Sequence, residues 1–162
     1  MARSNSDSTT RRLELYVRSL AYPSTYSQHE SLVERLSTLE TEGHIAGFEV
    51  TVWGKEVVVT PATARCETGR RLLDRVNEFR RWAREHSPSL EATFDSKPVV
   101  SELTGDQYSV IEFPVAVLAE YVGDELAYVT PAEAPDGTVF TVDDHLKALT
   151  TEEVRPRPQP TR

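Results

Sequence analysis

Two groups of strand-forming residues, far apart in the chain, most constrain how it can fold. The first is the apolar, alternating run 13–20, which is followed by a helical pattern and by a second strand-forming run, 48–53. The other begins with the long run 108–121 and continues through 125–130 to a helical pattern near 142–149. Strands that alternate with helices predict an α/β protein built on a mixed sheet.

The predicted element order is β-α-β-α-β-β-β-α in a single domain over residues 11–150, between disordered tails at 1–10 and 151–162. Ser27 is a good N-cap for a first helix that ends near Glu42, with Leu32, Leu36 and Leu39 on one face. The second helix is expected over 64–86, and its spacing predicts a core face of Leu72, Leu73, Val76, Phe79 and Ala83.

The two halves resemble those of thioredoxin-like proteins. Where such proteins carry Cys-x-x-Cys, this chain has Tyr22-Pro23-Ser24-Thr25, and Pro114 stands where they carry a cis-proline. The resemblance implies a groove near Tyr22, Thr25 and Pro114 without the redox chemistry. A trans bond before Pro114 stays open as well, because only about 5–6% of X–Pro bonds in folded proteins are cis.

The composition narrows the functional classes. The net charge is −8, and of the 18 basic residues only Lys55, Lys97 and Lys147 are lysines. This balance is typical of a protein from a salt-loving archaeon, with a GC-rich genome as the alternative. No apolar run is long enough to cross a membrane and no secretory signal is seen, so a cytoplasmic protein is expected.

The single Cys66 and four scattered histidines predict no disulfide, no metal site and no cofactor. Cys66 lies at the start of the second helix, where a helix dipole can lower the pKa of a thiol. Thioredoxin chemistry needs a second, resolving thiol, so no enzyme activity is expected. An ordinary thiol is the favoured interpretation of Cys66.

The second helix is rich in arginine for so acidic a chain. At 100° per residue, Arg70, Arg81 and Arg84 fall opposite the apolar face and form a stripe that can contact phosphates. A solvated face with pairs such as Glu67–Arg71 is the alternative. The first helix carries mostly glutamates, so the second is the better candidate for binding nucleic acid.

The segment 36–50 resembles the end of the helix-turn-helix in leucine-responsive regulators. Over residues 11–149 the chain resembles a family of small haloarchaeal helix-turn-helix domain proteins, through the segments 12–20, 52–55, 113–115 and 118–121. This resemblance implies a non-enzymatic, transcription-associated regulatory protein with a nucleic acid or a protein as its partner. The alternative is a thioredoxin-fold adaptor or redox-derived protein without the Cys-x-x-Cys site.

Overall fold

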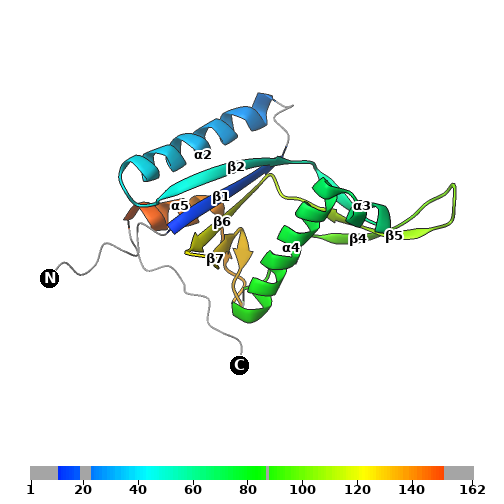
Figure 1. Cartoon of the computed structure of the whole chain (residues 1–162). Helices are drawn as coiled ribbons and strands as arrows, with labels where there is room; N and C mark the ends of the chain where they lie inside the picture. Colours follow the sequence, from blue (N-terminus) through cyan, green and yellow to red (C-terminus); the bar gives the residue numbers. More distant parts are fainter. Residues whose placement is uncertain (1–10, 19–22, 87, 152–162) are drawn as a thin grey trace.

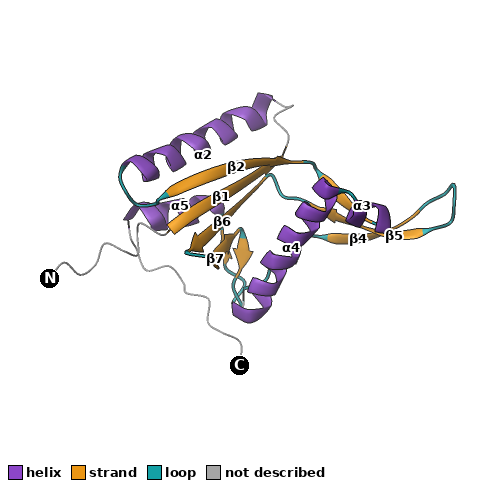
Figure 2. Ribbon diagram, in the orientation of Figure 1, coloured by secondary structure: helices purple, strands orange, loops and turns teal. Residues whose placement is uncertain are grey.

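The computed structural model describes residues 11–18, 23–86 and 88–151 and shows a mixed four-stranded sheet with helices on both faces (Figures 1 and 2). The strand order is β2-β1-β6-β7, from β1 (Arg11–Arg18), β2 (Gly47–Trp53), β6 (Ala116–Val122) and β7 (Glu125–Thr130). β1 and β2 are parallel, and β6 is antiparallel to both β1 and β7. The predicted α/β class is confirmed.

Both predicted halves are present. In the first, α2 (Pro23–Thr41) joins β1 to β2, and in the second, β6 and β7 lead to α5 (Val142–Thr151). They meet in the middle of the sheet, where Leu15 lies opposite Val50 on one side and Leu118 on the other. The thioredoxin-like assignment stays a prediction. The predicted tails lie outside the described residues, except that Thr151 closes α5.

The central strand β1 is buried on both faces because each face meets a helix. Leu13, Leu15 and Val17 pack with leucines of α2 and α5, while Tyr16 points to the opposite face, which α4 (Glu67–His86) covers. The alternation of side chains along a strand produces these two separate cores from one sequence.

The core beneath α4 is rich in aromatic rings. Trp53 stacks on Phe113 with ring centroids 4.2 Å apart and on Tyr16 at 5.0 Å, and Phe79 meets the edge of Tyr16. Trp53 ends β2 and Phe113 follows β5, so these rings hold together two places where the chain leaves or enters the main sheet.

A second sheet, of order β3-β5-β4, extends from the first (Figure 1). It consists of β3 (Glu56–Val59), β4 (Ser96–Val100) and β5 (Gln107–Glu112), and Pro98 is accommodated because β4 is an edge strand. The long run 108–121, in which Pro114 predicts a break or an edge, forms two strands, β5 and β6, on either side of that proline. The chain leaves the second sheet after Glu112 and enters the first at Ala116, because Pro114 has no N–H to continue a ladder.

Helix boundaries also differ from the predictions. α2 begins at Pro23, four residues before the predicted cap Ser27, in keeping with the preference of proline for the first helical position. The predicted helix over 64–86 is two helices, α3 (Pro61–Arg65) and α4, separated at Cys66. Thr60 caps α3, where its Oγ1 accepts a hydrogen bond of 3.1 Å from the Thr63 N–H.

The final helix has a reciprocal N-terminal cap. The Asp144 N–H donates to Thr141 Oγ1 at 3.1 Å, and the Thr141 N–H donates to Asp144 Oδ2 at 3.0 Å. Next to this cap, Asp143 accepts a hydrogen bond from Arg35 at 2.5 Å, so an ion pair links α5 to α2. A short pair, β8 (Ala132–Glu133) and β9 (Val139–Phe140), connects β7 to α5.

Candidate nucleic-acid interface

The two faces of α4 differ sharply in chemistry. Val76, Phe79, Trp82 and Ala83 are buried against the sheet; Trp82 extends the predicted core face. Arg70, Arg81 and Arg84 are exposed on the opposite side of the helix, as their spacing predicts. Their part in binding stays a prediction.

Other arginines of α4 are engaged within the protein. Arg71 pairs with Glu67 at 2.8 Å, which is the predicted i,i+4 pair, and Arg75 pairs with Glu78 at 3.0 Å. In contrast, the side chains of Arg70 and Arg81 form no ion pair with any residue in the described part of the chain. Two of the four carboxylates of α4, Glu67 and Glu78, therefore pair with Arg71 and Arg75. The other two, Asp74 and Glu85, lie four residues after Arg70 and Arg81 and form no ion pair with a described residue.

Asn77 lies between the available arginines on the outward face of α4 and is exposed. At 100° per residue it falls within about 20° of Arg70 and about 40° of Arg81. An asparagine in the middle of a cationic row is a candidate for hydrogen bonding to a base edge. Sequence reasoning missed it, although the same helical periodicity that selects the arginines also selects Asn77.

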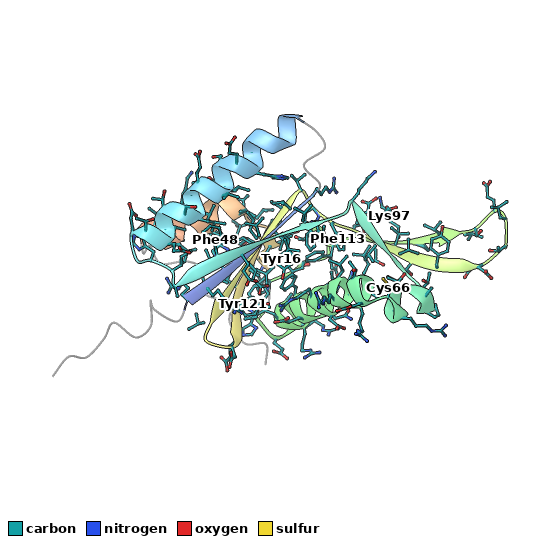
Figure 3. The ribbon with its side chains drawn as sticks, turned by 45° about the horizontal axis from the view of Figure 1, so that its top comes forward. Tyr16, Phe48, Cys66, Lys97, Phe113 and Tyr121 are labelled. Atoms are coloured by element: carbon teal, nitrogen blue, oxygen red, sulfur yellow. The ribbon has the colours of Figure 1, made fainter. Side chains whose placement is uncertain are left out.

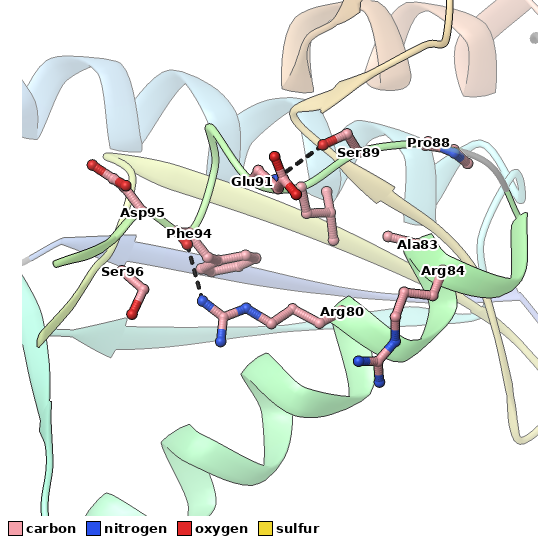
Figure 4. Close-up of a pocket in the computed structure, with 10 residues that line it drawn as sticks. Arg80, Ala83, Arg84, Pro88, Ser89, Glu91, Phe94, Asp95 and Ser96 are labelled. Carbon is pink, nitrogen blue, oxygen red and sulfur yellow. Dashed lines mark hydrogen bonds between the residues drawn. The ribbon is translucent and has the colours of Figure 1, made fainter. Parts of the chain in front are cut away.

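Arg80 and Arg84 lie at the edge of a cavity of about 720 Å³ beside the C-terminal end of α4 (Figure 4). Arg80 donates a hydrogen bond of 3.0 Å to the carbonyl of Phe94. Burial lowers the pKa of Arg80, and the nearby positive charge of Arg84 lowers it further. Because Glu91 and Asp95 also line the cavity, its charges do not favour one sign of ligand.

A polar network fixes α4 on the sheet. Arg75 reaches Glu14 of β1 at 3.5 Å and donates to the Tyr121 hydroxyl at 3.1 Å, and Tyr121 donates to Glu78 at 3.1 Å. The buried Tyr16 hydroxyl donates to Glu14 at 2.5 Å. Burial raises the pKa of both tyrosines, and neighbouring carboxylates raise it further, so both phenols stay protonated donors.

A second polar cluster lies on the opposite face of the sheet. His145 Nε2 is 3.1 Å from Glu120 Oε1, and His145 Nδ1 is 2.9 Å from Thr130 Oγ1. This arrangement of carboxylate, imidazole and hydroxyl has the order of a catalytic relay. All three residues are at most 1% exposed, so no substrate can reach the hydroxyl and the cluster acts structurally.

The groove expected near Tyr22, Thr25 and Pro114 stays a prediction. Tyr22 lies outside it, and Thr25 belongs to α2 without a described side chain. Pro114 is half-buried, and its bond to Phe113 is trans; the cis bond among the described residues is Thr130–Pro131.

Cys66 is exposed at the junction of α3 and α4 (Figure 3). Its carbonyl accepts the first hydrogen bond of α4, from the Arg70 N–H at 2.8 Å. The described residues contain no group of three or more His, Cys, Asp or Glu side chains placed to hold a metal ion.

The segment 36–50 forms the end of α2, a turn and the start of β2. Gly43 supplies the positive φ of 80° that ends the helix. Within the described ranges the element before α2 is the strand β1, so no positioning helix precedes it there. Two helices follow each other directly at α3 and α4, where a Cβ added to Gly69 would lie 2.6 Å from the Thr63 carbonyl oxygen.

In comparisons with known proteins, a family model described as a helix-turn-helix domain matches residues 5–154 of the chain. No curated protein and no solved structure matches the chain. Among the helices that the structure describes, none is long and apolar enough to cross a membrane.

Proposed function

The chain belongs to the helix-turn-helix domain family, and from this premise we propose that it is a non-enzymatic, transcription-associated regulatory protein that binds duplex DNA through the outward face of α4. The observation that carries the proposal is the separation of arginines on this helix. Arg71 and Arg75 are paired with carboxylates, whereas Arg70 and Arg81 on the outward side form no ion pair with a described residue.

The dimensions of α4 suit this role. Arg70 and Arg84 are separated by about 21 Å along the helix, at about 1.5 Å per residue, so the row spans several phosphates. Arg81 and Arg84 are close neighbours at i,i+3 and can contact phosphates together. Asn77 faces the same way and has the amide that can pair with the N6 and N7 atoms of adenine.

The α3–α4 pair supports α4 as the recognition element. In a helix-turn-helix the second helix enters the major groove, while the first helix crosses the DNA backbone. α3 is short and packs closely on the first turn of α4, where Gly69 allows the approach. The sheet behind α4 holds it through the network of Arg75, Tyr121 and Glu14.

The experiment is a fluorescence-anisotropy titration of the full chain with a labelled duplex across a salt series. Each phosphate contact contributes about −0.9 to the slope of log K against log salt, so three arginines predict a slope of about −3. The triple variant Arg70→Ala, Arg81→Ala, Arg84→Ala should lose at least tenfold in affinity at low salt and most of the slope.

The matched control removes three positive charges that lie off the outward face of α4, as Arg71→Ala, Lys97→Ala and Lys147→Ala. All three residues are exposed and paired with carboxylates. Equal losses in the two triple variants would show a general charge effect and contradict the α4 interface. Asn77→Ala should reduce the preference among duplex sequences while leaving the salt slope unchanged.

A further inference from the structure

We propose that the free edge of β2, together with the groove between β2 and α2, binds an extended basic segment of a partner protein as an added strand. Among the described residues β2 pairs with β1 alone and forms one edge of the main sheet (Figure 1). Residues 49–52 in the middle of β2 are all exposed. An exposed edge offers a row of backbone donors and acceptors to an incoming chain.

An apolar groove flanks this edge. A cavity of about 640 Å³ lies between α2 and β2. Its apolar lining comes from four valines, Val17, Val33, Val50 and Val52. Val50 is 41% exposed and Val52 is 54% exposed. Both lie opposite buried residues of β1, at Leu15 and Val17, so they face the same side of the sheet as α2. Added strands gain specificity from such pockets for alternate side chains.

His29 adds an unsatisfied polar group to the groove. The residue is 3% exposed, and neither ring nitrogen has a hydrogen-bond partner in the described part of the chain. Burial lowers the pKa of His29, and the backbone of Val115 offsets part of this decrease. His29 therefore brings a polar ring to an otherwise apolar part of the groove lining.

The charges around the edge select the occupant. Glu30 and Glu34 of α2 line the groove, and Glu49 lies on the other face of β2. All three are exposed, and none forms an ion pair with a described residue. Glu49 favours lysine or arginine among the side chains that an added strand would present on that face, and Glu30 and Glu34 add to the negative charge around the edge. These carboxylates disfavour a second copy of the chain, because a two-fold axis at this edge would bring like charges together.

The expected ligand therefore alternates. Its apolar side chains face α2 and contact Val50 and Val52, and its basic side chains lie between them and reach Glu49. The probe is a fluorescein-labelled seven-residue peptide in which lysine and valine alternate, titrated into the full chain and followed by anisotropy. The same peptide with glutamate in place of lysine is expected to bind at least tenfold more weakly.

Variants of the protein test the position of the site. The double variant Val50→Lys, Val52→Lys should weaken binding at least tenfold because it removes the apolar contacts and adds repulsion. The matched control is Val58→Lys, Val59→Lys on β3, where both valines are 38% exposed, and it should leave the affinity unchanged. Bound peptide should slow amide exchange over residues 47–53.

Four results would overturn the inference. The first is no binding of the lysine–valine peptide, the second is equal affinity for the glutamate peptide, and the third is an equal loss in the β3 control. The fourth is a dimer in solution that the Val50 and Val52 variant abolishes, because a second copy would then occupy the edge. The β2 edge and its groove do not include Arg70, Arg81 or Arg84, so the proposal of DNA binding is tested separately.

Discussion

At the scale of single residues, the contacts that hold elements together were the least visible in the sequence. Glu120, Thr130 and His145 form one buried cluster, yet they come from β6, β7 and α5. Nothing local distinguishes His145 from the other histidines of the chain. In contrast, Arg70, Arg81 and Arg84 could be selected from the sequence because helical periodicity alone decides which side chains face away from a core.

Asp143 gives a prediction with a definite pH dependence. Hydrogen bonds from Lys147 and Arg35 hold the pKa of this carboxyl below its usual range. A lowered folded-state pKa contributes stability above the ordinary value of about 3.9, and this contribution is lost as the pH falls through the folded value. Asp143→Asn should lower the free energy of unfolding by about 0.2–1 kcal/mol at pH 7, since the residue is half-exposed.

Urea unfolding at several pH values measures this difference, which should shrink towards zero below about pH 3.9. Asp74→Asn makes the same change of charge on α4. Asp74 forms no ion pair with any described residue, so this variant should have little effect. A loss for Asp143→Asn that persisted undiminished in acid would contradict the role of its charge.

At the scale of elements, the sequence predicted which strands and helices exist better than where they end. β1, β2, β6, β7 and α5 follow from alternation, apolar runs and capping residues. Pro114 marks the interruption within 108–121, but the break at Cys66 and the placement of β5 and β6 in different sheets depend on what packs against each segment. A pattern of apolar residues does not carry that information. The free edge of β2 was not foreseen for the same reason, because strand order is a tertiary property.

Gly69 is the residue on which the packing of α3 against α4 depends. A Cβ there would lie 2.6 Å from the Thr63 carbonyl oxygen and 2.7 Å from Thr63 Cγ2. Gly69→Ala should therefore destabilise the protein by about 1–3 kcal/mol, although alanine is the better helix former. Thermal unfolding followed by circular dichroism measures the effect.

Adding Thr63→Ser to Gly69→Ala should restore only part of the stability, because the methyl group is removed while the carbonyl stays in place. An increase in stability for Gly69→Ala alone would mean that α3 does not approach α4 this closely.

At the scale of the whole molecule, the surplus of negative charge opposes both the folded state and the binding of DNA. The net charge of −8 destabilises the compact state through self-repulsion and also repels DNA. Raising KCl from about 0.1 M to about 1 M shortens the Debye length from about 10 Å to about 3 Å. The unfolding temperature should rise over this range while affinity for duplex DNA falls.

Scanning calorimetry over the KCl series measures the first response. The triple variant Glu30→Gln, Glu34→Gln, Glu49→Gln removes three carboxylates that have no ion pair among the described residues, so its unfolding temperature should depend less on salt. An unfolding temperature that falls as KCl rises would contradict repulsion as the dominant effect.

The junction between the two sheets has a mechanical consequence. The chain passes directly from a strand of one sheet to a strand of the other twice, after Trp53 and after Glu112, and the Phe113 N–H donates a hydrogen bond of 2.8 Å to the Lys55 carbonyl. A third connection lies beside these two, because the Glu112 N–H donates a hydrogen bond of 2.9 Å to the Asp95 carbonyl, just before β4. Three segments therefore brace the base of the second sheet, and the stacked rings of Trp53 and Phe113 fill the joint between them.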